Sequence, residues 1–258
     1  MMNEIIKEYK IEICANSAQS ALNASIGGAN RVELCSGIPE GGITPSIGEI
    51  RATRRLLDSL KTQTQLNVII RPRGGDFLYS DLEISIMLDD ICAARDAGAD
   101  GVVFGCLTSN GDVDLSQMEK LMLAAEGMDM TFHRAFDMCR NPFDALEDII
   151  ELGCRRILTS GQKISAEDGI PLINDLISKA SQRIVIMPGC GIRENNIRKI
   201  AKETGASEFH FSARSSVESE MKWRNANVSM GGVVMIDEYQ CDVTDPKKVA
   251  AAIEQLQK

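Results

Sequence analysis

Short hydrophobic runs rich in β-branched residues recur along the chain, and longer amphipathic stretches with helical periodicity separate them. Runs of this length and composition, bounded by turn residues, predict β-strands. Eight of them are present, at residues 11–15, 31–35, 67–73, 101–106, 130–136, 156–160, 183–187 and 208–212.

The stretches between and after these strands have the apolar spacing of helices that cover a sheet. We predict helices at residues 17–27, 46–62, 81–97, 114–125, 142–152, 169–180, 195–204 and 245–257. Several end in a glycine just before the next strand, which is a common helix stop signal. For the last helix, Thr244 is the predicted N-cap and Pro246 lies in the first turn.

Strict alternation of strands and helices predicts an α/β fold with a parallel sheet. Eight strands in 258 residues favour closure into a single (β/α)8 TIM barrel over residues 1–258. A doubly wound open sheet is the alternative that the same alternation permits. Residues 213–243 fit neither pattern, and we predict that they form a loop over the barrel mouth.

Polar residues recur at every second position of several predicted strands. Residues two apart share one face of a strand, and in a barrel one face points inward. The pairs and triplet that share a face are Glu12 with Cys14, Glu33 with Cys35, Arg71 with Arg73, Thr131 with His133, and Glu208 with His210 and Ser212.

These inward charges have two interpretations. A salt-bridge network that fills the lower barrel would satisfy them, and Glu12 and Glu208 fit that interpretation because they lie early in their strands. Residues late in their strands lie where barrel enzymes keep their chemistry. A catalytic site would then contain the polar side chains Glu33, Arg71, Arg73, His133 and His210, with the histidines as acid and base.

An anion site is the second hypothesis for the barrel mouth. Arg71 and Arg73 offer two guanidinium groups for bidentate recognition. Gly189 and Gly191 follow the seventh strand, where barrels often bind phosphate, and Ser212 ends the eighth. A tight turn without ligand is the alternative for the glycines.

The charge of the whole chain excludes some partners. A formal net charge of −9 repels nucleic acid and anionic lipid. The first residues lack the apolar run of a signal peptide, which together with unpaired cysteine spacing predicts a cytoplasmic protein with reduced thiols. Walker, HExxH and GxSxG motifs are absent, which argues against nucleotide triphosphatase, zincin and serine hydrolase chemistry.

Five blocks of this sequence resemble the CutC copper homeostasis family. They are RVELCSGIPEGGITPS at 31–46, IRPRGGDFLYSD at 70–81, DGVVFGCLTSNGDVD at 100–114, TFHRAFD at 131–137 and ILTSG at 157–161. The resemblance runs from about residue 10 to about residue 214. It implies a cytosolic TIM barrel that is often oligomeric, so we expect a homo-oligomer, most simply a dimer.

The resemblance also implies copper binding. The family has been proposed to bind Cu(I) through one cysteine on the first strand and one on the second, and Cys14 and Cys35 match those positions. Neighbouring strands lie about 4.8 Å apart, and soft Cu(I) prefers thiolates, so two inward thiols there can share one ion. Cys190, between two glycines, departs from the family's usual glycine run.

Two function classes follow. The first is a copper homeostasis protein that binds Cu(I) through Cys14 and Cys35. The second is a TIM-barrel enzyme that acts on a small phosphorylated or carboxylated metabolite, because the polar ring at the mouth exceeds what two thiols require. Neither class calls for nucleic acid or a membrane as a partner.

Overall fold

The eight predicted strands form one parallel sheet in the computed structural model, which describes residues 8–225, 227–230 and 236–258. The strands are β1 (Lys10–Ala15), β2 (Arg31–Leu34), β3 (Gln65–Ile69), β4 (Gly101–Phe104), β5 (Asp129–Phe132), β6 (Arg156–Thr159), β7 (Val185–Pro188) and β8 (Glu208–Phe211).

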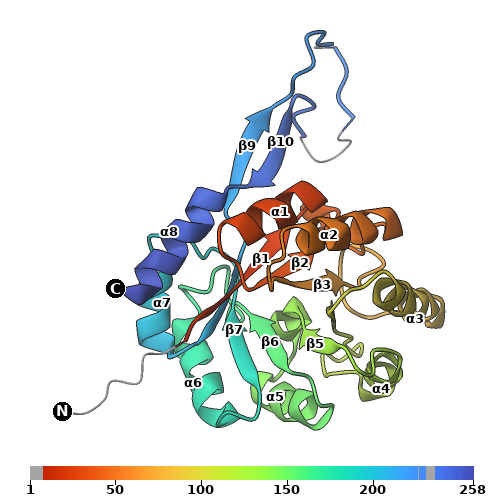
Figure 1. Ribbon diagram of the computed structural model, residues 1–258. Helices are drawn as coiled ribbons and strands as arrows, with labels where there is room; N and C mark the ends of the chain where they lie inside the picture. The colour runs from red at the N-terminus through yellow and green to blue at the C-terminus, as the bar shows by residue number, and fades with distance from the viewer. Residues whose placement is uncertain (1–7, 226, 231–235) are drawn as a thin grey trace.

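Eight α-helices alternate with these strands and surround them (Figure 1). They are α1 (Ala18–Ile26), α2 (Ile47–Ser59), α3 (Asp81–Asp96), α4 (Leu115–Ala124), α5 (Pro142–Glu151), α6 (Ile170–Ala180), α7 (Ile197–Thr204) and α8 (Pro246–Gln257). Two short 3-10 turns, η1 (Ile38–Glu40) and η2 (Arg134–Met138), follow β2 and β5. Asp245, not Thr244, caps α8, because its carboxylate accepts the backbone N–H of Lys247.

The strand order runs β7-β6-β5-β4-β3-β2-β1-β8, so the last strand pairs with the first. Gly189, just after β7, forms an isolated parallel bridge with His210 of β8 and closes the circle. A Cβ atom at Gly189 would lie 2.5 Å from Cδ1 of Leu158, so a larger residue at this seam would displace that side chain. The fold is therefore the predicted (β/α)8 barrel, and not the open doubly wound sheet.

The outward faces of the strands form the core between sheet and helices. Ile11, Ile13, Val32 and Leu34 are at most 2% exposed and pack beneath the helices. Because these positions alternate with the polar residues, the polar side chains of β1, β2 and β8 point into the barrel, as predicted.

Two strands, β3 and β5, end four residues earlier than the sequence pattern predicts. β3 ends at Ile69 and β5 at Phe132, so Arg71, Arg73 and His133 lie in the loops that follow. Pro72 has no N–H to donate to a neighbouring strand, which is consistent with the early end of β3. The strand alternation that predicts an inward direction for Arg71 and Arg73 therefore does not extend to these residues.

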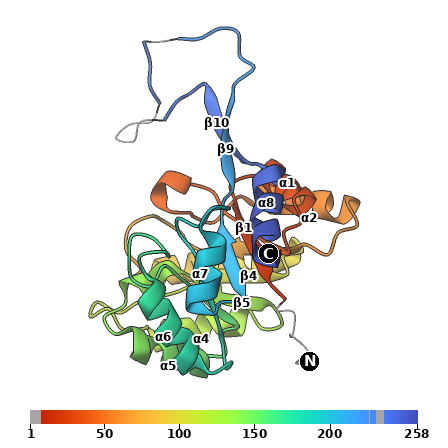
Figure 2. The same cartoon turned by 90° about the vertical axis from the view of Figure 1, so that its left-hand side faces the viewer.

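The prediction of a loop over the mouth for residues 213–243 is also wrong where the structure describes them. β9 (Arg214–Glu218) and β10 (Gln240–Thr244) pair antiparallel. They form a ribbon, here called the arm (214–244), that extends away from the barrel beside α1 and α8 (Figures 1 and 2). Asn23 fixes its base by donating to the carbonyl of Thr244 at 2.8 Å. Residues 226 and 231–235 of this segment lie outside the described residues.

A search of the described residues for a helix both long and apolar enough to span a bilayer finds no candidate.

Candidate metal centre

A buried ion-pair network fills the lower barrel. The Arg31 guanidinium binds Glu12 and also Glu208, the latter at 2.7 Å. Arg156 reaches the same Glu208 oxygen at 3.2 Å and Asp129 at 2.7 Å. Glu12 and Glu208 are thus neutralised within the fold, in agreement with the salt-bridge interpretation of their positions.

Two thiols meet directly above this layer. The Sγ atoms of Cys14 and Cys35 are 3.4 Å apart. Parallel pairing sets Cys14 opposite Glu33, and Cys35 follows β2 two residues later on the same face. Cys35 is buried, whereas Cys14 is half-buried and faces a cavity.

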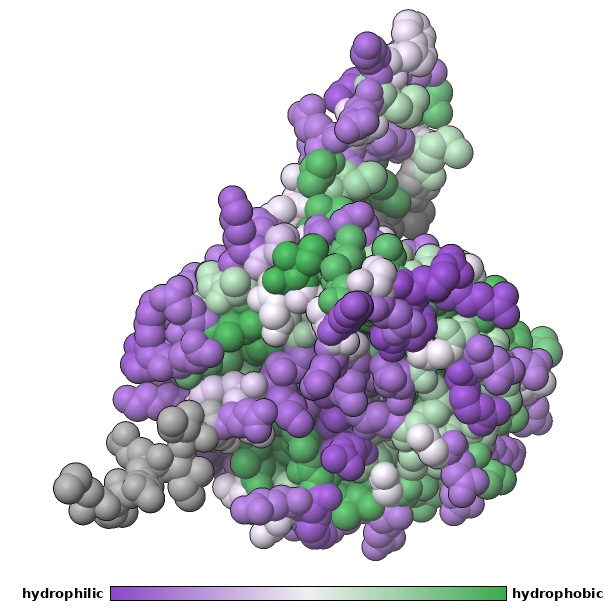
Figure 3. All heavy atoms as spheres, viewed as in Figure 1, coloured by the Kyte–Doolittle hydropathy of each residue, from purple (hydrophilic) through white to green (hydrophobic). Residues whose placement is uncertain are grey.

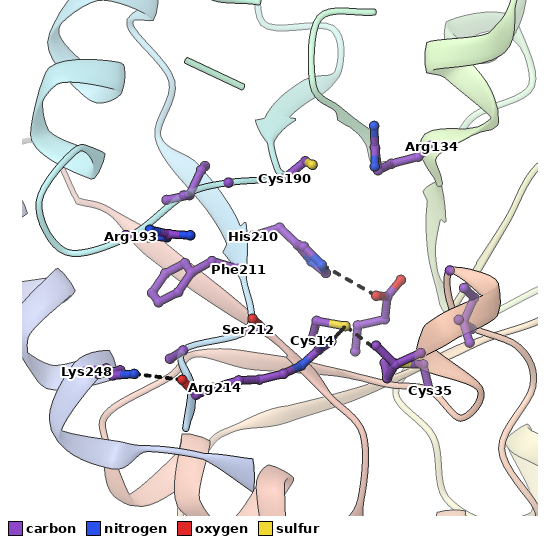
Figure 4. A pocket seen from close by; sticks show the side chains of 18 of the residues that line it. Cys14, Cys35, Arg134, Cys190, Arg193, His210, Phe211, Ser212, Arg214 and Lys248 are labelled. Atoms are coloured by element: carbon purple, nitrogen blue, oxygen red, sulfur yellow. Dashed lines mark hydrogen bonds and ion pairs between the residues drawn. The ribbon is translucent and has the colours of Figure 1, made fainter. Parts of the chain in front are cut away.

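His210 and Glu33 complete the cluster around Cys14. His210 Nδ1 is 2.7 Å from Glu12 Oε1, and its Nε2 is 3.6 Å from Glu33 Oε2. One ligand atom each from Cys14, Glu33 and His210 lies within 4.8 Å of the others. Figure 4 shows His210 and Cys14 pointing toward one another across the site. The Oε1 atom of Glu33 is buried without a hydrogen-bond partner among the described residues.

Charge separation is favoured between Cys14 and His210. The thiol of Cys35 donates to Cys14 and lowers the pKa of Cys14 well below the usual thiol value, and His210 and Arg214 add to this effect against burial. Burial disfavours a charged His210, yet Glu33, Cys14 and Glu12 together raise its pKa well above the usual value. Both shifts favour a thiolate at Cys14 beside a protonated His210.

The other two titratable groups of the cluster hold their protons. The pKa of Cys35 is raised because its thiol donates to Cys14 and because it is buried. Burial raises the pKa of Glu33 to about 8, although the charge of His210 opposes the shift. Both shifts favour the protonated forms of Cys35 and Glu33.

A cavity of about 850 Å³ opens above the cluster at the carboxyl ends of the strands. Cys14, Cys35, Glu33 and His210 form its floor, and the segments after β7 and β8 form one wall. Arg134, Arg193, Arg214 and Lys248 also line it (Figure 4).

The geometry can now be compared with known proteins. A family model described as the CutC family matches residues 9–215. A family protein CutC of Bacteroides thetaiotaomicron is 59% identical over 97% of this chain and 99% of its own length. The human copper homeostasis protein cutC homolog is 49% identical over 93% of this chain and 86% of its own length. The chain belongs to the CutC family.

A solved structure agrees with this assignment. A CutC protein of Streptococcus agalactiae superposes with a TM-score of 0.75 at 35% identity, over 79% of this chain and 98% of the other. The CutC family match ends at residue 215, where the arm begins. The barrel, and not the arm, is thus the part that the family model describes.

In this CutC chain, Arg71 uses its guanidinium to hold loops together. It donates to the backbone carbonyls of Glu40, Gly42 and Gly75 at 2.8–3.0 Å and is 5% exposed. Arg73 pairs with Glu83 and Asp76. The predicted anion site needs a free guanidinium at the mouth, and neither arginine provides one, because loop carbonyls engage Arg71 and carboxylates engage Arg73.

Some of the remaining predicted residues line the cavity, and the others lie at the β7–β8 seam or at η2. Gly191 and Ser212 line the cavity, and Gly189 forms the seam between β7 and β8. His133 caps η2 by accepting the backbone N–H of Ala135 and packs against Phe77, with ring centroids 4.8 Å apart. It is not among the described residues that line the cavity with His210.

Sequence reasoning missed several charged residues of the barrel. Arg31 shares its strand face with Glu33 and Cys35, and this spacing was a usable signal. Arg156 starts β6 and faces inward in the same way. For Arg193, Arg214 and Lys248 the sequence carries no local signal, because they come from a loop, strand β9 and helix α8, whose positions depend on the closed barrel.

Proposed function

We propose that this CutC family protein binds Cu(I) through the thiols of Cys14 and Cys35 and serves in copper homeostasis. The observation that carries the proposal is the 3.4 Å separation of the two sulfur atoms on neighbouring strands beside an open cavity. The names of related proteins, such as the human copper homeostasis protein cutC homolog, support the cellular role.

The chemistry of the donor set fits Cu(I). Soft thiolate ligands select this ion over hard cations, and the thiolate is the form that binds metal. The lowered pKa of Cys14 favours its thiolate form, and a bound cation would favour loss of the proton from Cys35. The pair therefore supplies the two donors that the ion requires.

His210 is placed to support the same ion. Glu12 binds its Nδ1, so Nε2 is the nitrogen left on the side of Cys14 and Glu33. A carboxylate that fixes one ring nitrogen orients the other, as is usual around metal-binding histidines. Deprotonated His210 would then add a third donor.

The test is an anaerobic Cu(I) titration against a chromophoric chelator. We expect about one equivalent to bind the reduced wild-type protein and none to bind the Cys14→Ser/Cys35→Ser variant. Cys241→Ser removes an exposed thiol of the arm, away from the cluster, and should match the wild type. Unchanged stoichiometry and affinity in the double variant would exclude this site and direct attention to Cys106 or Cys190.

A second candidate is an enzyme that acts on a small anionic metabolite. The observation that favours it is the cavity of about 850 Å³, which is far larger than a single ion needs. His210 and Glu33 would act as proton donors, since the pKa of each buried group is raised at the cavity floor. A thermal-shift screen of metabolites with metal-free protein tests this candidate, which fails if Cu(I) alone raises the melting temperature.

A further inference from the structure

The cavity above the thiol pair carries positive charge in an acidic protein. Its described lining contains four cationic side chains, Arg134, Arg193, Arg214 and Lys248, against two carboxyl groups, Glu33 and Glu194, so cationic groups are in excess. The whole chain has a formal net charge of −9. A positively charged cleft in a negatively charged protein concentrates anionic ligands.

The four cations differ in what neutralises them. Arg134 binds Asp137 at 2.7 Å and Ser160 at 3.0 Å, so its charge is satisfied within the fold. Lys248 donates to the backbone carbonyl of Arg214 at 2.7 Å. In the described part of the chain, Arg193, Arg214 and Lys248 form no ion pair with a carboxylate.

Arg214 is the most informative of these residues. It is half-buried, its Nη2 lies 3.7 Å from Cys14 Sγ, and its Nε is buried without a hydrogen-bond partner among the described residues. A buried donor of a charged group that lacks a partner is costly. An anion seated in the cavity would supply the missing acceptor.

The backbone of the same wall is held in an uncommon conformation. Cys190 and Ala213 line the cavity and have φ angles of 77° and 47°, although neither is glycine. Residues held in this left-handed region gather at ligand-binding sites, where the surrounding fold maintains them. Both follow a strand at the closing seam of the barrel, and loops after strands 7 and 8 often bind phosphate in barrels.

We propose that this cavity binds a phosphate monoester, with Arg214, Arg193 and Lys248 around the phosphate group and the organic part toward Cys14 and His210. A phosphate monoester carries about two negative charges at neutral pH and three acceptor oxygens, which matches the excess charge and the available donors. The proposal refines the second candidate function by naming its ligand class, and it does not depend on copper.

The test is isothermal titration calorimetry of metal-free protein with glycerol 3-phosphate, succinate and glycerol. We expect glycerol 3-phosphate to bind, and succinate and glycerol to bind at least about tenfold more weakly. Arg193→Met and Arg214→Met should each weaken binding by about tenfold or more. Arg51→Met removes an exposed arginine of α2 and should leave the affinity unchanged.

Three results would overturn the proposal. They are no heat with glycerol 3-phosphate at millimolar concentration, tighter binding of succinate, or wild-type affinity in both Arg193→Met and Arg214→Met. Arg193 is exposed on a loop, so its variant remains informative if Arg214→Met proves unstable. The titration uses metal-free protein and measures no turnover. A negative result would therefore count against phosphate binding alone, and copper binding and catalysis on another class of ligand would be tested separately.

Discussion

Arg31 lies fully inside the barrel, 2% exposed, between the carboxylates of Glu12 and Glu208. These two acids raise the pKa of Arg31 against the opposing effect of burial, so its charge is permanent. A buried arginine with two acidic partners cannot be removed without leaving unpaired charge behind.

We predict that Arg31→Met lowers the free energy of unfolding by about 3–5 kcal/mol, because it leaves Glu12 and Glu208 buried with one partner fewer. Urea denaturation measures the change. Arg183→Met is the matched control, since it breaks an exposed ion pair with Glu147 and should leave the unfolding midpoint nearly unchanged. Equal midpoints for Arg31→Met and wild type would mean that the network contributes no stability.

His133 provides a separate test at low pH. Burial, and then the charge of Arg71, lower its pKa to about 3 from an ordinary value of 6.5. Between these two values the unfolded chain binds a proton that the folded chain does not bind. Stability therefore falls as the pH falls from 6.5 toward 3.

We expect this histidine to contribute a slope of up to about 1.4 kcal/mol per pH unit in that window. His133→Asn keeps a side chain that can cap η2 but removes the titration, so its stability should fall less steeply with acid. Denaturation curves from pH 7 to pH 4 measure the difference. Parallel pH dependence in variant and wild type would contradict the assignment.

At the scale of elements, close contact between strands imposes its own requirement. A Cβ at Gly101, the first residue of β4, would lie 2.5 Å from Asn67 Oδ1 and 2.6 Å from the backbone oxygen of Asp129. The neighbouring strand backbone cannot move away without breaking sheet pairing. Gly48, in α2, has its nearest neighbour at 3.8 Å.

We predict opposite effects for the same substitution at these two glycines. Gly101→Ala should lower the free energy of unfolding by about 1–3 kcal/mol through overpacking. Gly48→Ala should raise it by about 0.5–1 kcal/mol, because alanine favours the helix. Thermal or urea unfolding compares them, and a stable Gly101→Ala protein would show that β4 and its neighbours are less tightly packed than described.

The sequence predicts the elements well and the site in part, for physical reasons that differ between residues. Cys14, Cys35, Glu33 and His210 lie within or directly after regular strands, where two-residue alternation holds. Arg71 and Arg73 lie two and four residues beyond the end of β3, where alternation no longer holds, and the side chain of His133, directly after β5, caps η2. The end of β3 at Ile69 is set by its pairing with β4, and the local sequence pattern of β3 carries no information about that pairing.

The arm was missed because its pairing is long-range. Residues 219–239 separate β9 from β10, so the two strands are not joined by a short hairpin turn that the sequence could reveal. Lys248 and Arg214 reach the cavity only after α8 and β9 pack beside the closed barrel. Contacts of this kind follow from tertiary packing, which the hydrophobic pattern of one segment does not specify.

At the scale of the whole molecule, the arm exposes apolar side chains beyond the barrel (Figure 3). Met221, Trp223 and Met230 are 58%, 78% and 82% exposed. Contiguous patches of exposed apolar side chains often mark the sites where a protein binds a partner.

We propose that the chain is a homodimer in solution, in keeping with the common symmetry of such assemblies. Light scattering at micromolar concentration should give about twice the chain mass of 28.2 kDa. Trp223→Ser/Met230→Ser should shift the mass toward the monomer if the arm forms the interface, while an exposed barrel variant such as Leu123→Ser should not. A wild-type mass near 28.2 kDa would refute the dimer.

The central claim is that Cys14 and Cys35 bind one Cu(I) ion together. X-ray absorption spectroscopy of protein loaded anaerobically with one equivalent of Cu(I) tests it most directly, because it counts sulfur neighbours of the metal. The account predicts two sulfur neighbours in the wild type and none in Cys14→Ser/Cys35→Ser. A wild-type spectrum with only nitrogen or oxygen neighbours, or the same sulfur signal in the double variant, would contradict it.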